Sequence, residues 1–210
     1  MAGAVVLVFG PGGSGKSTTA EIVSSRLGWH HLEEDSYWVG RGWGAGHGFR
    51  TEDEEAQIQQ HVLRDITSLT CEGTCVVLDF ILYKTPPNPL TAYSAALNQL
   101  SISYCTIALR PSVDAIIDRM TMRGRANDLA DLDLRRRQAA DQLATMSAAG
   151  VAPHRTLDST GLSAHRVGDR CIETIASVLL RHVEQPRTSA RSSLESSLPT
   201  SQLDPPPRSL

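Results

Sequence analysis

The chain has 210 residues, 40% of them hydrophobic and 20% charged, and its formal net charge at pH 7 is −3. These values predict one globular domain with a full core, because the chain is too short for two domains of ordinary size. The small negative charge gives no electrostatic reason to expect nucleic acid as a partner, and the apolar runs are too short to span a membrane.

A glycine-rich turn, residues 10–17 (GPGGSGKS), follows the first apolar run at residues 4–9. Apolar residues at helical spacing come next, so the order is buried strand, turn and helix. In this context the pattern G-x-x-x-x-G-K-[ST] predicts a phosphate-binding loop, with a flexible Gly/Ser surface loop as the alternative. The start of the helix adds its positive dipole end. We therefore predict that the chain binds a nucleoside triphosphate.

The residues of the phosphate-binding loop, 10–17, have separate expected roles. Lys16 can reach the β- and γ-phosphates, and the hydroxyl of Ser17 can complete a Mg²⁺ shell. The glycines at 12, 13 and 15 are expected to adopt positive φ and to bring backbone N–H groups close to phosphate oxygens. The full set expected to contact the nucleotide is Gly10, Gly12, Gly13, Ser14, Gly15, Lys16, Ser17 and Thr18.

A short strand candidate at residues 29–32 leads through an acidic cluster, residues 33–35, into the segment 37–48. Glycine occupies every second position from 40 to 48, which argues against a stable helix and predicts a mobile surface segment. A helix is expected at 51–69, where Thr51 and Glu54 have the spacing of a capping box.

The rest of the chain alternates between strand and helix candidates, which predicts an α/β fold. We expect the three-layer P-loop NTPase fold, with a central parallel five-stranded sheet, helices on both faces and a small arginine lid at 122–128. Further strands are expected at 74–79, 103–109 and 154–157, and helices at 90–99, after the N-cap Ser112, at 131–148 and at 163–183.

The composition changes near the C-terminus, where serine and proline dominate and no periodicity is present. We therefore expect a P-loop domain at residues 1–183 and a disordered tail at 184–210. The four cysteines lack a zinc-binding spacing, so we expect reduced thiols in a cytosolic (cytoplasmic) protein, with cysteine ligation of a metal as the alternative.

Two carboxylates follow predicted strands, where ligands gather in an open parallel sheet. Asp35, after the second strand, could accept a hydrogen bond and then the proton of an attacking hydroxyl, or it could belong to a solvated acidic turn. Asp79 ends the string VVLD and could hold Mg²⁺ directly or through water, or it could cap the next turn.

Three arginines lie in the predicted lid or just before it. Arg123 and Arg125 flank Gly124, and Arg119 lies one helical turn earlier. Arginines on a mobile loop can stabilise the negative charge of phosphoryl transfer and exclude water, although basic residues beside glycine are also common on surfaces.

Residues 4–183 resemble the P-loop small-molecule kinases grouped with shikimate kinase, gluconate kinase, chloramphenicol phosphotransferase and the nucleoside monophosphate kinases. The resemblance is carried by GPGGSGKST, by Asp35, by Arg50 at the start of the next helix, by the lid arginines and by LDSTG at 157–161. It implies MgATP as phosphoryl donor, Asp35 at the acceptor hydroxyl and Arg50 at an anionic group of the acceptor. It also implies that Arg119, Arg123 and Arg125 lie near the ATP phosphates, and that LDSTG borders the adenine.

The chain departs from these relatives at two places. Shikimate kinase has a glycine triplet after its third strand, whereas this chain has Asp79-Phe-Ile-Leu, which argues against shikimate as the acceptor. Glu33 and Asp35 stand where relatives commonly have two Asp, which weakens the case for Glu33 in positioning Mg²⁺ and leaves Glu33 and Asp79 as alternatives.

The function predicted from the sequence is transfer of the γ-phosphoryl group of MgATP to a hydroxyl of a small molecule such as a sugar acid or a sugar. A nucleoside or nucleotide kinase is the alternative, with Tyr37, Trp38 or Trp43 stacked on the base. A nucleotide-switched GTPase would need an Asn-Lys pair, which the sequence lacks. A non-catalytic module remains the last alternative.

Overall fold

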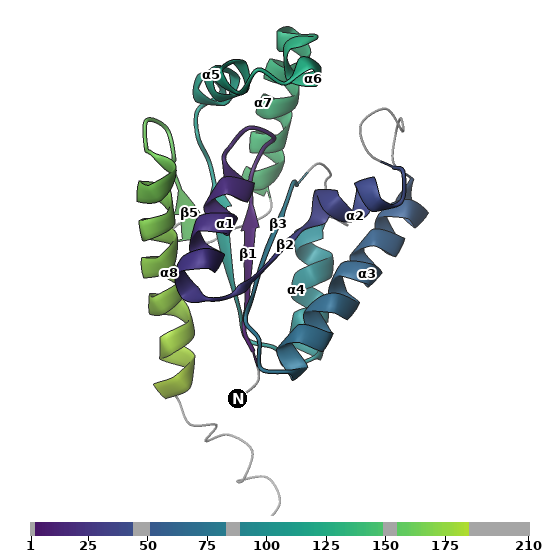
Figure 1. The fold of residues 1–210 in the computed structure, drawn as a ribbon, viewed down its shortest axis with the longest axis vertical. Coiled ribbons are helices and arrows are strands. Elements are labelled where there is room, and N and C mark those ends of the chain that lie inside the picture. Colours follow the sequence, from purple (N-terminus) through teal and green to yellow (C-terminus); the bar gives the residue numbers. More distant parts are fainter. Residues whose placement is uncertain (1–2, 44–50, 83–88, 149–154, 185–210) are drawn as a thin grey trace, which may run out of the picture.

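The described residues form five strands in one sheet, and every pair of neighbouring strands is parallel (Figure 1). The structure is a computed structural model that describes residues 3–43, 51–82, 89–148 and 155–184. The strand order is β2-β3-β1-β4-β5, with β1 in the centre, which confirms the predicted α/β class. The strands are β1 (Val5–Phe9), β2 (His30–Glu33), β3 (Val76–Phe80), β4 (Tyr104–Leu109) and β5 (Thr156–Leu157).

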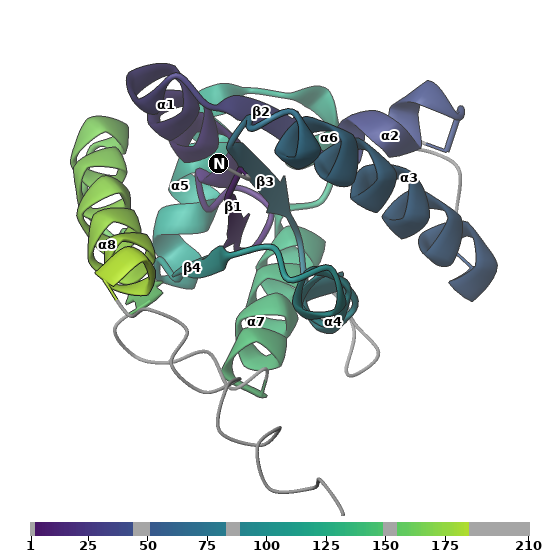
Figure 2. The same cartoon turned by 90° about the horizontal axis from the view of Figure 1, so that it is seen from below.

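Helices cover both faces of the sheet, as Figures 1 and 2 show. Helices α1 and α8 lie together on one face, and α3 and α4 cover the other together with the C-terminal part of α7, whose Met146 belongs to that half of the core. Helices α5 and α6 lie beyond the carboxyl ends of the strands. In the described part of the chain, none of these helices is long and apolar enough to cross a bilayer. Their bounds are α1 (Lys16–Leu27), α2 (Glu34–Gly40), α3 (Glu52–Cys71), α4 (Pro89–Gln99), α5 (Val113–Arg123), α6 (Ala126–Leu129), α7 (Leu132–Ala148) and α8 (Ala164–Glu184).

The core has two halves because side chains along a strand alternate between the faces of the sheet. On β1, Val6 and Val8 pack with the buried residues of α1 and α8. The intervening residues Val5, Leu7 and Phe9 pack with those of α3 and α4. The strand is therefore apolar throughout, as expected of a central parallel strand that is buried on both sides.

Two predicted helix caps are present. The hydroxyl of Thr51 accepts from the backbone N–H of Glu54, whose carboxylate accepts in turn from the N–H of Thr51, which confirms the capping box. Ser112 caps α5 by accepting from the N–H of Ala115.

The expectation that 37–48 would not form a helix is wrong for its first residues, because α2 extends to Gly40. The glycines of the described part fall at and after the last turn of this helix, and Gly42, with a φ of 74°, lies beyond it. The interior of α2 therefore carries no glycine that could weaken it. Residues 44–48 lie outside the described residues.

The described start of the segment 37–48 is also packed, whereas a surface segment was expected; its mobility stays a prediction. The hydroxyl of Tyr37 donates to Asp65 of α3 at 2.9 Å. Trp38 is only 1% exposed and lies against Trp43, with ring centroids 6.0 Å apart. The sequence pattern could not predict this packing, because it depends on contacts with a helix that comes later in the chain.

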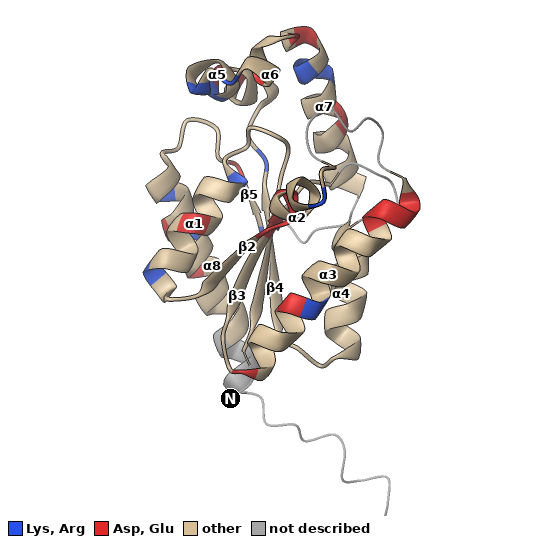
Figure 3. Cartoon of the chain, turned by 45° about the vertical axis from the view of Figure 1, so that its right-hand side comes forward, with Lys and Arg blue, Asp and Glu red and all other residues tan. Residues whose placement is uncertain are grey.

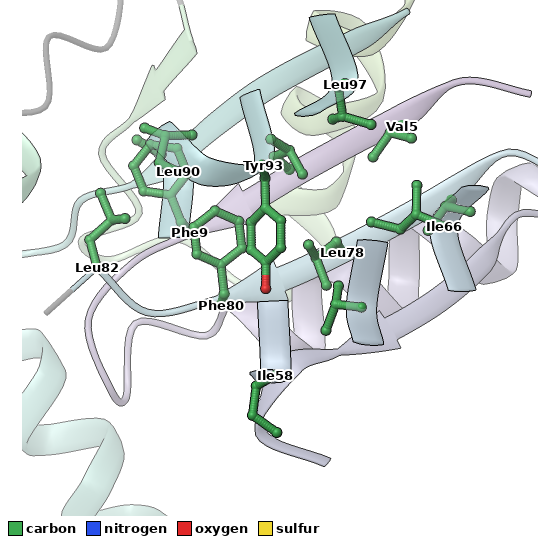
Figure 4. Packing of buried hydrophobic residues seen from close by; sticks show 14 of the residues in the cluster. Val5, Phe9, Ile58, Ile66, Leu78, Phe80, Leu82, Leu90, Tyr93 and Leu97 are labelled. Carbon is green, nitrogen blue, oxygen red and sulfur yellow. The ribbon is translucent and has the colours of Figure 1, made fainter. Parts of the chain in front are cut away.

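A buried hydrogen bond joins the start of α2 to α4. The hydroxyl of Tyr93 donates to Oε1 of Glu34 at 2.5 Å, and both residues are buried. The ring of Tyr93 meets Phe80 edge-on, with centroids 5.2 Å apart, and Phe80 stacks on Phe9 at 5.7 Å (Figure 4). The aromatic cluster thus fixes the hydroxyl that binds the first residue of α2.

We expect Tyr93→Phe to lower the free energy of unfolding by about 1–3 kcal/mol, because it keeps the ring but removes a hydrogen bond to a buried carboxylate. Denaturant unfolding measures the change. The matched control is Tyr104→Phe, whose hydroxyl accepts a longer bond of 3.3 Å from Asn98 at an exposed position. Equal stability of the two variants would contradict this account.

Candidate functional site

The phosphate-binding loop joins the carboxyl end of β1 to the first residue of α1. Gly13 and Gly15 have φ values of 80° and 90°, as expected, whereas Gly12 does not adopt positive φ and the prediction for it is wrong. A Cβ on Gly13 would lie only 3.0 Å from the side chain of Met120, so this glycine also allows α5 to pack against the loop. Gly10 is buried, and a Cβ there would meet Oγ of Ser14 at 2.6 Å.

Lys16 brings a cation to the loop and is only 8% exposed. Among the described residues, no carboxylate forms an ion pair with it. A buried ammonium group needs a counter-charge, and here the N-terminus of α1 favours a negative ligand at the same place. The loop therefore has the charge and the donors of an anion site.

Two cavities open on either side of this loop. The smaller one, of about 280 Å³, lies between the loop, Arg119 and the start of α8, where Leu162 and Val167 line it. The larger one, of about 1100 Å³, lies between the loop, α2 and α5–α7. The residues that line both are Gly13, Lys16, Ser17, Thr18 and Arg123.

Arg119 connects the loop to the turn after β5. Its guanidinium donates to the backbone oxygen of Ser14 at 2.8 Å and to that of Ser159 at 2.6 Å. Burial lowers the pKa of Arg119, and the charge of Asp158 opposes this effect. Arg119 thus lines the smaller cavity, where nucleotide contact was expected, and also holds two of its walls together.

The larger cavity has carboxylates on the side of α2. Asp35 lies in the first turn of α2, and Glu33 is the last residue of β2; both line the cavity. Of the aromatic residues considered for base stacking, Trp38 lines this cavity but is almost wholly buried, and Tyr37 and Trp43 are not among its lining residues. The first turn of α2 thus places a half-buried carboxylate opposite the phosphate-binding loop.

The opposite wall comes from α5–α7 and carries Arg123, Arg125 and Arg135 together with Asp128. Figure 3 colours the basic and acidic segments of these helices blue and red. Arg123 and Arg125 both line the larger cavity, which places them together as expected. The loop predicted at 122–128 is shorter in the structure, because Arg123 ends α5 and α6 begins at Ala126. Arg123 binds Oδ2 of Asp128 through Nε at 3.1 Å and through Nη2 at 2.5 Å. This ion pair holds the guanidinium between the two cavities.

The residues proposed for Mg²⁺ pass a simple test of fit. The side chain of Asp79 is fully buried, and its Oδ2 has no hydrogen-bond partner in the described part of the chain. Its Oδ1 lies 3.3 Å from Nε2 of His31, and this hydrogen bond raises the pKa of His31 although partial burial opposes the shift. A buried carboxylate oxygen without a partner is costly unless a cation or water satisfies it. Ser17 lines both cavities and Asp79 lines neither, so Asp79 suits a contact through a water of a Mg²⁺ that Ser17 and phosphate would hold.

One side of α7 also lines the larger cavity, which was not predicted from the sequence. Arg135, Gln138, Ala139 and Gln142 line the cavity from successive turns of α7. Their spacing of three and four residues is the signal that could have placed them on one helical face. Arg50, expected to bind the acceptor, lies outside the described residues.

Comparison with solved structures finds small-molecule kinases. The chain superposes on a gluconokinase from Sinorhizobium meliloti with a TM-score of 0.60 and 15% identity, covering 88% of this chain and 98% of that one. A sugar kinase from Janibacter sp. gives 0.59 and 15%, with coverage of 84% and 95%. A shikimate kinase from Acinetobacter baumannii in complex with shikimate gives 0.59 and 18%, with coverage of 83% and 94%.

These identities are low, and the likeness is one of fold. No protein-family model matches the sequence, and no curated protein matches it either. The chain therefore has the architecture of the P-loop kinases that the sequence resembles, with a parallel sheet and the loop in the same overall topology.

We expect Asp79→Asn to leave the thermal midpoint of the free protein unchanged or higher, because the neutral amide costs less to bury than a carboxylate oxygen without a partner. It should also weaken Mg²⁺ binding in the presence of ATP by about 10- to 100-fold. Calorimetric titration with and without Mg²⁺ measures the second effect. A strongly destabilised variant that retains full metal affinity would assign Asp79 to the fold instead.

Proposed function

We propose that this protein is a kinase that transfers the γ-phosphoryl group of ATP to a hydroxyl of a small molecule, with Mg²⁺ bound at Ser17 and Asp79. The observation that carries the proposal is the meeting of two cavities at one phosphate-binding loop. Phosphoryl transfer needs a donor and an acceptor on opposite sides of the transferred group, and catalysis consists mainly of positioning and charge stabilisation. A site that only held a nucleotide would not need the second cavity.

The residues that line each cavity indicate which substrate it would bind. The smaller cavity leads from the loop toward apolar residues at the start of α8, which suits the nucleoside part of ATP. The larger cavity combines carboxylates from β2 and α2 with arginines and amides from α5–α7, which suits a small polar molecule with hydroxyl groups. We infer that ATP occupies the smaller cavity and the acceptor the larger one.

Each proposed role follows from the position of the side chain. The ammonium of Lys16 and the N–H groups of the loop would bind the β- and γ-phosphates. The carboxylate of Asp35 would orient the acceptor hydroxyl and take its proton during the attack. The guanidinium groups of Arg123 and Arg125 would stabilise the charge on the equatorial oxygens. When bound, Mg²⁺ would neutralise part of the phosphate charge.

The proposed acceptor is a sugar acid, a sugar or a similar compound. The polar wall of the larger cavity supports this class, and the almost complete burial of Trp38 leaves little ring surface on which a base could stack. A nucleoside is therefore the weaker candidate. Arg50 remains a proposed contact for an anionic group of the acceptor.

A coupled assay of ADP release tests the proposal. The compounds are sugar acids, sugars, nucleosides and aminoalcohols, each with MgATP. We expect one of the first two classes to stimulate ADP release, and Lys16→Ala to reduce that rate by at least about 10²-fold without unfolding the chain. Arg26→Ala is the control, since Arg26 lies on the same helix in an exposed ion pair with Asp169. Wild-type turnover by folded Lys16→Ala would overturn the assignment of the loop.

The role of Asp35 has its own test. We expect Asp35→Asn to lower kcat by at least about 10²-fold, the usual scale for loss of a general base, while ATP binds nearly as before. Asp53→Asn, on the exposed first turn of α3, controls for the change of charge. If Asp35→Asn weakens ATP binding but turns over normally at saturation, the base is another group.

A further inference from the structure

A side chain from α7 holds the phosphate-binding loop. Oε1 of Gln142 accepts a hydrogen bond of 3.0 Å from the backbone N–H of Gly12, across 130 positions of the chain. Gln142 is half-buried between Ala139 and Met146, which are the buried residues of α7. The side chain therefore projects from an anchored part of the helix, and neither the phosphate-loop pattern nor the lid pattern of the sequence predicts the contact.

The bond acts on the first turn of the loop. The N–H of Ser14 donates to the backbone oxygen of Pro11 at 3.1 Å, which closes a turn over residues 11–14. Pro11 has no N–H of its own, so Gly12 carries the first N–H of this turn. Because a peptide unit is planar, holding the N–H of Gly12 also orients the peptide bond between Pro11 and Gly12.

The hydrogen bond to Gln142 restricts a loop that is otherwise flexible, because the loop is rich in glycine. Glycine loses more conformational freedom than any other residue when it is ordered. A ligand that had to order the loop would bind more weakly by that entropy, whereas a loop that is already ordered binds without it. The next residue, Gly13, is held from another side by Met120 and Ile116 of α5. Together α5 and α7 support the turn before any phosphate arrives.

A neutral amide suits this position. Its oxygen accepts from the loop without adding charge, whereas a carboxylate at the same place would accept the same hydrogen bond but repel the phosphates. Gln142 also lines the larger cavity, so the residue that holds the loop belongs to the wall of the other substrate site.

We propose that Gln142 is a positioning residue that keeps the phosphate-binding loop in its anion-binding shape and thereby raises the affinity for the phosphates of ATP. This inference rests on the proposed function only in taking MgATP as the ligand of the loop. Gln142 acts through Gly12 and is assigned no contact with the reacting atoms.

The test compares Gln142→Met with wild type by calorimetric titration. Methionine keeps the length and much of the volume of the side chain but cannot replace the amide oxygen. The probes are a non-hydrolysable ATP analogue with Mg²⁺, which uses the loop, and adenosine, which does not. We expect the variant to bind the analogue about three- to tenfold more weakly, the size of one net hydrogen bond, and adenosine as wild type does. Gln60→Met, the same substitution at an exposed position of α3, should change neither affinity.

Two results would overturn the proposal. One is an unchanged affinity of Gln142→Met for the analogue. The other is an equal loss for the analogue and adenosine, which would mean a general structural defect. Failure of wild type to bind the analogue would instead contradict the proposed function.

Amide hydrogen exchange tests the same contact in the wild-type protein and does not depend on the folding of Gln142→Met. Amide hydrogen exchange at Gly12, without any ligand, should be slowed at least about tenfold relative to an unprotected amide, because its N–H is bonded to Gln142. Exchange at the unprotected rate would show that the loop is not held and would overturn the inference, whatever the protein binds.

Discussion

A buried cation without a counter-charge is costly, and within the described ranges no carboxylate pairs with Lys16, which lies between two cavities. A bound anion would offset this desolvation cost. The loop that carries Lys16 provides backbone donors and a helix N-terminus for such an anion. The surrounding architecture serves this arrangement. Strand β1 is buried on both faces and fixes one end of the loop, while α1 fixes the other.

The charges around the loop are divided between the two sides of the larger cavity. Carboxylates come from the junction of β2 and α2, and guanidinium groups come from α5 to α7 (Figure 3). Two polar contacts, one buried and one partly exposed, keep this division in place. Glu34 is bound by Tyr93 of α4, which fixes the first turn of α2 and with it Asp35. Asp128 binds Arg123, which keeps a cation at the place where the cavities meet.

Much of this arrangement could be predicted from the sequence, because local patterns determine it. The order of strands and helices, the caps at Thr51 and Ser112, and the loop before Lys16 all follow from residue types at short spacing. The failures have a common physical cause. Helix α2 could not be predicted from the sequence because its stability depends on packing against α3. The contact between Gln142 and Gly12 could not be predicted because it joins residues 130 positions apart. Long-range contacts of this kind leave no periodic signal in a single sequence.

The central claim is that a nucleotide and an acceptor meet at Lys16 from opposite cavities. A crystal structure with a non-hydrolysable ATP analogue and Mg²⁺ tests it most directly. The account predicts the phosphates against residues 13–18, the base toward Leu162 and Val167, and a larger cavity that stays open beside Asp35. An analogue bound with its base in the larger cavity, or phosphates away from the loop, would contradict it.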